Sequence, residues 1–185
     1  MCDLCDAALS PHGRARRRVL MGGAGAGVLL LAPPVFAAQS RALSFYHTHT
    51  GERLKITFAE RGALVPAALE EVSRFLRDFR TGLMHPIDPA LLEALHELQR
   101  NTGARGPYEI ISAYRSPQTN EMLRARSNGV AQGSLHMEGR AIDVRLRGVA
   151  TVRLREAALK LQAGGVGYYP ESDFVHVDTG RVRFW

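Results

Sequence analysis

Apolar and polar positions first alternate with the period of β-strands and then recur with the period of a helix. Residues 43–47 and 53–58 predict two strands, and the segment between them contains Gly51, so a hairpin is expected. Over residues 66–80 the apolar side chains fall on one stripe at helical spacing, which predicts an amphipathic helix. That stripe consists of Leu69, Val72, Phe75, Leu76 and Phe79.

The remainder of the chain mixes short strands with helices. A second helix is expected to begin after Asp88, because Asp-Pro is a favourable N-cap and first-turn pair, and to end at Gly103. Further strands are predicted over residues 108–113, 141–146, 166–169 and 174–178, and further helices over 116–127 and 151–163. This mixed order predicts an α+β fold in which helices pack on one side of a small antiparallel sheet.

The first 37 residues have the composition of an export signal. Four arginines lie between residues 14 and 18, and residues 19–34 form an uncharged apolar stretch rich in Gly and Ala. Val35-Phe36-Ala37 offers a cleavage point, so residues 1–37 are predicted to be a secretory signal peptide. Arg16-Arg17 resembles a twin-arginine signal, and the general secretion route is the alternative. An uncleaved membrane anchor is disfavoured, because the apolar run is shorter than the roughly 20 residues that a span needs.

Composition and charge suit an exported domain over residues 38–185. The chain is 45% hydrophobic and 23% charged, as is usual for a globular protein. The first 37 residues carry four Arg and two Asp, so cleavage would lower the net charge from +6 to +4. Cleavage would also remove Cys2 and Cys5 and leave no cysteine for a disulfide. This modest positive charge suits an anionic polymer of the cell envelope. Export and the scattered positions of the basic residues do not favour nucleic acid.

Two segments near the end of the chain carry a set of metal-ligand residues. Strand alternation places Asp143 and His176 on the faces opposite to their apolar neighbours, so they can meet if the two strands lie side by side. His136 precedes Asp143 by seven residues in a polar turn, where Gly139 allows the backbone to fold back. Two histidines and one carboxylate form the ligand set of a catalytic zinc site, with a fourth position left for water. Ordinary polar roles for these side chains are the alternative.

The pattern His-x6-Asp followed by Asp-x2-His resembles the zinc peptidases that are grouped with lysostaphin, the D-Ala-D-Ala carboxypeptidases and hedgehog. Longer segments resemble the YcbK-type murein endopeptidase branch of that group, and the resemblance covers Arg41 to Trp185. These segments are LSFYHTHTGE at 43–52, RTGLMHPIDP at 80–89, SAYRSP at 112–117 and GGVGYYP at 164–170. The resemblance implies one zinc peptidase domain over residues 38–185, with its zinc site on the open face of the sheet.

The resemblance also implies roles for five residues. His136, Asp143 and His176 match the ligands of one Zn²⁺ ion, and Asp173 matches the general base three residues before the last ligand. The carboxypeptidase-like relatives usually carry Glu at that position, and the shorter Asp side chain reaches less far. Arg115 matches an arginine that faces the substrate, where a guanidinium can stabilise an oxyanion or hold a carboxylate.

Three further residues have open assignments. Ser134 can orient the neighbouring ligand histidine, touch the substrate, or stabilise the turn with a hydrogen bond. Asp178 can accept the free ring N–H of a ligand histidine, or it can pair with Arg145 or Arg181. His85 lies in a loop and can line a substrate groove.

The implied function is hydrolysis of peptide cross-links in peptidoglycan during cell wall remodelling. For this branch the cross-links join two diaminopimelate residues (3-3 cross-links). The expected partners are the peptide stems of peptidoglycan, acted on by a monomer in the periplasm. A D,D-carboxypeptidase or another cross-link endopeptidase is the alternative among enzymes. The alternative that is not an enzyme is a zinc-stabilised module that binds the cell wall without catalysis. Such a module would not need Asp173 or Arg115.

Overall fold

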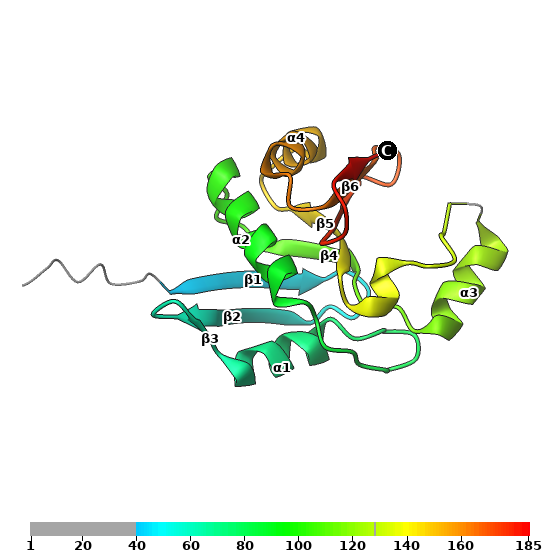
Figure 1. The fold of residues 1–185 in the computed structure, drawn as a ribbon, viewed down its shortest axis with the longest axis horizontal. Helices are drawn as coiled ribbons and strands as arrows, with labels where there is room; N and C mark the ends of the chain where they lie inside the picture. The colour runs from blue at the N-terminus through cyan, green and yellow to red at the C-terminus, as the bar shows by residue number, and fades with distance from the viewer. Residues whose placement is uncertain (1–39, 128) are drawn as a thin grey trace, which may run out of the picture. The chain divides into compact units, whose positions relative to one another are not determined.

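One sheet of eight strands runs through the part of the chain that this computed structural model describes, residues 40–127 and 129–185 (Figure 1). Its strand order is β3-β2-β1-β4-β5-β7-β6-β8. The strands are β1 (Arg41–His47), β2 (Arg53–Glu60), β3 (Ala63–Leu64), β4 (Tyr108–Ser112), β5 (Ala141–Leu146), β6 (Gly165–Tyr169), β7 (Phe174–Asp178) and β8 (Arg183–Phe184). The predicted signal peptide, residues 1–37, lies outside the described residues. Among the described helices, none is both long enough and apolar enough to span a membrane.

The α+β class is confirmed, but the sheet is larger than expected and its strands run in both directions. β1 pairs with β4 in parallel, and β6 pairs with β8 in parallel, whereas the other neighbours are antiparallel. The expectation of a small antiparallel sheet is therefore corrected. Two helices separate β3 from β4 in the sequence, and such a crossover lets β4 return beside β1 in the same direction. β3 and β8 are only two residues long each, too short to show alternation.

Four helices accompany the sheet: α1 (Pro66–Phe75), α2 (Pro89–Thr102), α3 (Pro117–Arg126) and α4 (Thr151–Leu161). The predicted boundaries of α2 are confirmed, because the Asp88 side chain caps its first turn and Gly103 follows its last turn with a φ of 69°. α1 ends at Phe75, earlier than predicted. The segment after it turns away from the helix, and Asp78 there binds Ser116 at the start of α3.

The hydrophobic core lies between the sheet and three of the helices. Phe45 of β1 packs against Phe75 of α1 with ring centroids 5.9 Å apart, and the Tyr108 hydroxyl of β4 donates to the Leu95 carbonyl of α2 at 2.7 Å. Leu154 of α4 is fully buried in the same cluster. In Figure 1, α2 lies between α1 and α4, whereas α3 extends beyond the end of the sheet.

Strands β5 and β7 carry polar residues on the face that points away from this core. They pair antiparallel, with Asp143 directly opposite His176. Their neighbours Ile142, Val144 and Val177 are buried in the hydrophobic core. Because side chains alternate between the faces of a strand, Asp143 and His176 point to the opposite face together.

Asp78 fastens the loop after α1 to the start of α3. Its Oδ2 accepts from the backbone N and the Oγ of Ser116 at 2.9 and 2.6 Å, and its Oδ1 accepts from the backbone N of Arg80 at 3.0 Å. Burial alone would raise the pKa of Asp78, but hydrogen bonds from Ser116, Thr119 and Arg80 outweigh it and lower the pKa to about 2. The folded state therefore favours the charged carboxylate.

We expect Asp78→Ala to lower the free energy of unfolding by about 2–4 kcal/mol at pH 7, because buried donors lose a charged acceptor. A carboxyl whose pKa is depressed by folding contributes stability above its unfolded value and loses it as the pH falls through the folded value. The difference from wild type should therefore shrink as the pH falls from 3.8 towards 2. Urea unfolding over this pH range measures it, with Glu97→Gln on the exposed side of α2 as the control. A difference that does not change with pH would contradict this account.

Candidate active site

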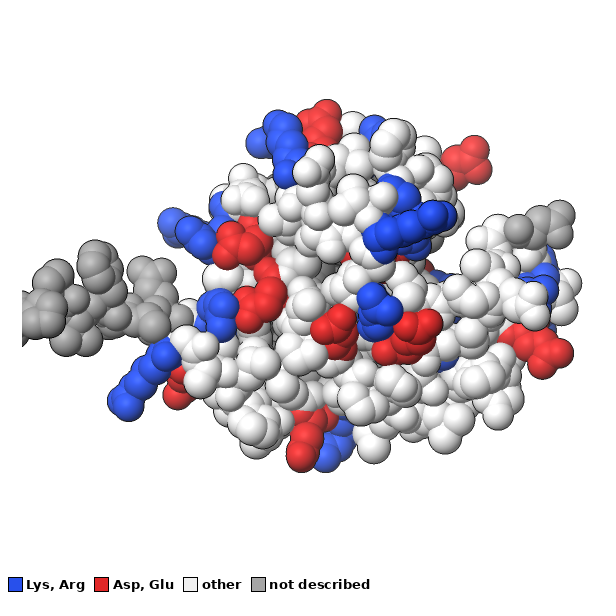
Figure 2. Space-filling view, in the orientation of Figure 1, with Lys and Arg blue, Asp and Glu red and all other residues white. Residues whose placement is uncertain are grey.

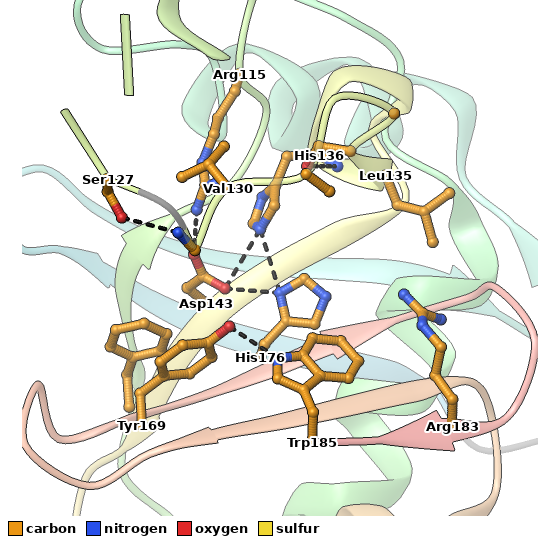
Figure 3. Close-up of a pocket in the computed structure, with 15 residues that line it drawn as sticks. Arg115, Ser127, Val130, Leu135, His136, Asp143, Tyr169, His176, Arg183 and Trp185 are labelled. Carbon is orange, nitrogen blue, oxygen red and sulfur yellow. Dashed lines mark hydrogen bonds and ion pairs between the residues drawn. The ribbon is translucent and has the colours of Figure 1, made fainter. Parts of the chain in front are cut away.

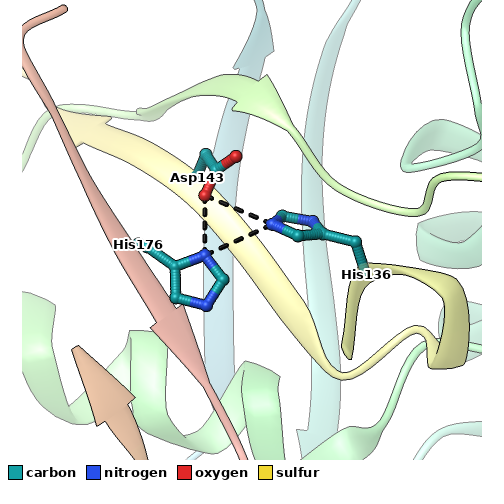
Figure 4. Close-up of side chains that lie close together, drawn as sticks. All are labelled: His136, Asp143 and His176. Atoms are coloured by element: carbon teal, nitrogen blue, oxygen red, sulfur yellow. Dashed lines mark hydrogen bonds and ion pairs between the residues drawn. The ribbon is translucent and has the colours of Figure 1, made fainter. Parts of the chain in front are cut away.

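Three buried side chains from separate elements converge at one point (Figure 4). His136 comes from η1, a 3-10 turn over Leu135–Glu138, Asp143 from β5 and His176 from β7. His176 Nδ1 and His136 Nε2 lie 2.8 and 3.3 Å from Asp143 Oδ1, and the two ring nitrogens lie 3.3 Å apart. The structure thus brings together the three residues that the sequence analysis proposed as metal ligands.

The geometry and chemistry of this cluster fit a zinc ion. Tetrahedral Zn²⁺ with bonds of about 2.0–2.1 Å holds its ligand atoms about 3.3 Å apart, and the three separations here are 2.8, 3.3 and 3.3 Å. Imidazole nitrogen and carboxylate oxygen are both ligands that zinc accepts. His136, Asp143 and His176 would supply three of the four ligands that zinc takes in catalytic sites.

Both histidines are oriented by acceptors on their other ring nitrogen. His136 Nδ1 lies 2.6 Å from the carbonyl oxygen of Ala113, and His176 Nε2 lies 3.1 Å from Asp178 Oδ2. A carbonyl oxygen can only accept, so His136 Nδ1 carries the proton and Nε2 presents its lone pair to the cluster. Asp178 can likewise hold a proton on His176 Nε2, which would leave Nδ1 to bind a metal, as is common for metal-binding histidines.

Neighbouring charges set the protonation of the cluster. Burial alone would raise the pKa of Asp143, but His136, His176 and Arg115 outweigh it and hold the pKa well below the usual range of a carboxyl. Burial lowers the pKa of His136, so its imidazole favours the neutral form. Burial also acts to lower the pKa of His176, but Asp143 and Asp178 outweigh it and raise the pKa. A cation at the cluster would replace the proton that these carboxylates attract to His176 Nδ1.

The turn that presents His136 is fixed from both sides. Ser134 caps η1 by accepting from the backbone N of His136 at 3.4 Å, which supports the turn-stabilising assignment of this serine. Gly139 ends the turn with a φ of 66°, a left-handed conformation that suits glycine. A side chain at this position would also collide with Pro86, whose carbonyl oxygen would lie 2.2 Å from the added Cβ.

Arg115 lies beside the cluster and contacts Asp143 directly (Figure 3). Its Nη2 donates to Asp143 Oδ2, and its Nε donates to Ser112 Oγ at 2.7 Å. Its backbone N donates to the carbonyl oxygen of His136 at 3.1 Å, so the arginine is held to two members of the cluster. The side chain is 14% exposed and lines the cavity. A substrate in the cavity can therefore meet a guanidinium already fixed in place.

Asp178 contacts His176 and also forms an ion pair with an arginine. The arginine is Arg183, whereas the sequence suggested Arg145 or Arg181. Asp178 is fully buried and accepts from Arg183 Nη2 at 2.6 Å as well as contacting His176 Nε2. The backbone N of Gly165 and of Gly180 donate to its Oδ1 at 2.9 and 2.8 Å. Asp178 is therefore held from three sides while it orients His176.

The structure does not bring Asp173 to the cluster. Its carboxylate accepts from Thr151 Oγ1 at 2.9 Å and lies 3.4 Å from Arg145 Nη1, with 58% of the side chain exposed. It is absent from the described residues that line the cavity. Asp173 ends the β6–β7 turn with a φ of 50°, and its N donates to the carbonyl of Pro170 at 3.2 Å. The turn thus places the Asp173 carboxylate beside Thr151 and Arg145.

His85 also lies outside the cavity. Its ring stacks on Tyr114 at 5.2 Å, and its Nδ1 lies 2.8 Å from the carbonyl oxygen of Pro86. The residue therefore supports the loop against which Gly139 packs, and the structure gives it no contact with the cluster.

A cavity of about 280 Å³ opens above the cluster. One wall contains Ser127, Val130 and Leu135, and the other contains Tyr169 and Trp185 (Figure 3). Phe174 also lines the cavity. In the space-filling view the surface is hollowed between α3 and the last strands (Figure 2). His136 and His176 line this cavity on the sheet face that points away from the hydrophobic core, and they are only 2% and 8% exposed. Local sequence patterns do not indicate this aromatic lining, because Tyr169 and Trp185 meet only through the pairing of β6 with the end of the chain.

The buried cluster of two histidines and an aspartate beside a cavity is a candidate metal site, and the family match identifies the chain as a peptidase. Residues 35–185 match the family described as Peptidoglycan L,D-endopeptidase MepK, and the chain belongs to that family. It is 44% identical over 175 residues to the Peptidoglycan L,D-endopeptidase MepK of Escherichia coli (strain K12), covering 92% of this chain and 96% of that protein. It is 42% identical over 175 residues to the Probable peptidoglycan L,D-endopeptidase MepK of Haemophilus influenzae, covering 92% and 94%.

Proposed function

We propose that this protein is a zinc-dependent peptidoglycan hydrolase that cleaves the 3-3 cross-links between two diaminopimelate residues in cell wall remodelling. The observation that carries the proposal is the buried cluster of His136, Asp143 and His176 beneath a cavity, in a chain that is 44% identical to an L,D-endopeptidase. His136 Nε2, Asp143 Oδ1 and His176 Nδ1 would hold the ion. When bound there, zinc would supply Lewis-acid chemistry and lower the pKa of a water molecule.

The side chains of the site then have separable tasks. Arg115 keeps Asp143 in its orientation and directs a positive charge into the cavity. There the guanidinium can stabilise the negative charge that develops on the carbonyl oxygen of the scissile peptide. Asp178 and the Ala113 carbonyl keep the two imidazole rings in the tautomers that bind a metal.

The place of the protein follows from its substrate. Peptidoglycan lies outside the cytoplasm, so residues 1–37 are proposed to export the enzyme to the periplasm, by the twin-arginine or the general secretion route. Acidic and basic side chains are interspersed over the face shown in Figure 2, a pattern that does not favour nucleic acid as a partner. We propose that the enzyme acts as a monomer on peptide stems.

The position of Asp173 leads to a specific expectation. As a general base it would have to leave Thr151 and Arg145 and move from the β6–β7 turn to the cluster. We therefore expect Asp173→Ala to keep bound zinc and to reduce kcat by no more than about threefold, as for an exposed residue away from the reaction. Steady-state hydrolysis of a cross-linked muropeptide measures this. A loss of a hundredfold or more with zinc retained would instead restore Asp173 as the base.

Asp178 is expected to act on metal affinity. Asp178→Asn keeps the shape of the side chain but removes the charge that orients His176, and such outer partners typically contribute 10–100-fold to metal affinity. We expect the zinc dissociation constant to rise by about that factor, as measured by competition with a chromophoric chelator. Glu138→Gln, an exposed carboxylate of η1 that pairs with Arg140, is the matched control. If Asp178→Asn binds zinc as tightly as wild type, Asp178 does not contribute to metal affinity through His176.

The products of digestion test the proposed bond. Purified protein is incubated with defined 3-3 and 4-3 cross-linked muropeptide dimers, and the products are weighed by mass spectrometry. Conversion of the 3-3 dimer to monomers is expected. Release of D-alanine from stems whose dimers stay intact would instead identify a D,D-carboxypeptidase. Zinc binding without any change in either substrate would identify a wall-binding module.

A further inference from the structure

Tyr169 lies on the same face of the sheet as the metal-ligand cluster. In the pairing of β6 with β7, Gly167 is opposite His176 and Tyr169 is opposite Phe174. Alternation therefore places the Tyr169 side chain beside the cluster, while Tyr168 points to the other face. Figure 3 shows the phenol ring of Tyr169 extending from β6 with its hydroxyl directed toward the cluster.

The hydroxyl of Tyr169 is held in a defined role by Trp185. The indole Nε1 of Trp185 lies 2.8 Å from the Tyr169 oxygen. An indole N–H can only donate, so the phenol oxygen is the acceptor in this bond. Within the described residues the Tyr169 hydroxyl donates to no acceptor, so its own proton is available to a group in the cavity.

Trp185 is in turn fixed by the strands around it. Its backbone N donates to the Val166 carbonyl at 3.2 Å, and its carbonyl accepts from the Tyr168 N at 3.1 Å. The indole occupies the space left by Gly167, where an added Cβ would lie 2.7 Å from the ring. The ring centroid is 5.2 Å from that of His176, so the indole connects the cluster to the phenol.

We propose that Tyr169 is a catalytic residue whose hydroxyl donates a hydrogen bond to the substrate's carbonyl oxygen as negative charge develops there. The proton stays on the phenol oxygen throughout, and no bond at Tyr169 is broken. Tyr169 thus complements Arg115 from the opposite wall of the cavity. Trp185 is a positioning residue. Its indole N–H donates to the phenol oxygen of Tyr169, and this bond orients the O–H group toward the cavity. The inference rests on the proposed peptidase function.

Tyr169→Phe tests the donor, because it removes one hydroxyl and keeps the ring. We expect kcat to fall about 100-fold, the order of loss when one oxyanion donor is removed, with KM within about threefold of wild type. Zinc content and melting temperature should not change. Tyr168→Phe is the matched control, because that ring lies under Arg155 on the other face, and it should keep wild-type kcat. Wild-type kcat in Tyr169→Phe, or loss of zinc with the activity, would overturn the proposal.

A double-mutant cycle tests Trp185. Trp185→Phe keeps an aromatic ring but removes the N–H, and kcat should fall roughly tenfold when Tyr169 is present. In the Tyr169→Phe variant the same change should have almost no further effect, because the hydroxyl that it orients is gone. If the fall in kcat of the double variant equals the product of the two single falls, Trp185 acts independently of Tyr169.

Binding of a phosphinate analogue of the scissile peptide separates this proposal from the function on which it rests. Its charged oxygen imitates the developing oxyanion, so we expect Tyr169→Phe to weaken its binding about 100-fold and Tyr168→Phe to leave it unchanged. Calorimetry measures this without turnover. If wild type binds the analogue but hydrolyses no cross-link, the proposed function fails. If both variants bind like wild type, the role of Tyr169 fails whatever the enzyme cleaves.

Discussion

Asp143→Asn should remove both bound zinc and cross-link hydrolysis. Asp143 Oδ1 lies 2.8 and 3.3 Å from the nitrogen atoms of the two histidines, and the residue is only 4% exposed, so no water can replace it without rearrangement. An amide has nearly the same shape but carries no charge to offset a dication. The Lewis-acid contribution of a metal is several kcal/mol, which corresponds to a loss of about 10³–10⁴ in rate.

Zinc content by mass spectrometry of metals and turnover of a 3-3 cross-linked dimer measure this prediction. Asp173→Asn is the matched control, because it makes the same chemical change beside the same strand pair but at Thr151, outside the cavity. We expect the control to keep one zinc per chain and near-normal turnover. An Asp143→Asn protein that binds zinc and hydrolyses normally would show that Asp143 is not a ligand.

Arg115→Ala should lower kcat by about 10²–10³ while most of the zinc stays bound. The expected loss is that of an electrostatic donor aimed at a developing oxyanion. Arg115→Lys should recover only a part of it, because one ammonium cannot reproduce the two bonds of the guanidinium, from Nε to Ser112 and from Nη2 to Asp143.

The kinetic parameter that changes distinguishes the two roles that the sequence left open for Arg115. A loss in kcat with unchanged KM is expected for oxyanion stabilisation, whereas a rise in KM alone would show that Arg115 holds a substrate carboxylate. Arg147→Ala is the control, since that arginine is half exposed and pairs with Glu109 away from the cavity. Zinc content is measured in the same Arg115→Ala sample. A loss of zinc would show that part of the fall in kcat arises from a displaced Asp143.

Local periodicity was sufficient to predict the elements that build the site. The strands predicted over 141–146 and 174–178 are present with those boundaries, and alternation within them placed Asp143 and His176 on the same face. The glycine at position 139 likewise predicted a turn there. Gly139 has a left-handed φ and ends the short helical turn that contains His136. These features depend on residues close together in the sequence.

Alternation does not determine the position of Asp173, because this residue precedes β7 and has a left-handed φ of 50°. The structure adds the β-turn at Pro170, which holds the carboxylate beside Thr151. A three-residue spacing in the sequence therefore does not determine where the Asp173 carboxylate lies.

Features that depend on distant pairing could not be predicted from local patterns. β8 is two residues long and joins the sheet by pairing in parallel with β6. Arg183 and Trp185 therefore reach Asp178 and the cavity through tertiary structure that no periodicity signals. The mixed sheet was missed for the same reason, because the parallel pairing of β1 with β4 depends on how the intervening helices cross.

The most direct test of the account is the turnover of one defined 3-3 cross-linked dimer by the same protein sample before chelation, after chelation and after one equivalent of zinc is restored. We predict that hydrolysis to monomers disappears on chelation and returns with zinc for wild type, but does not return for Asp143→Asn. Hydrolysis that continues at the wild-type rate in the chelated, zinc-free protein would contradict a zinc-dependent site at His136, Asp143 and His176.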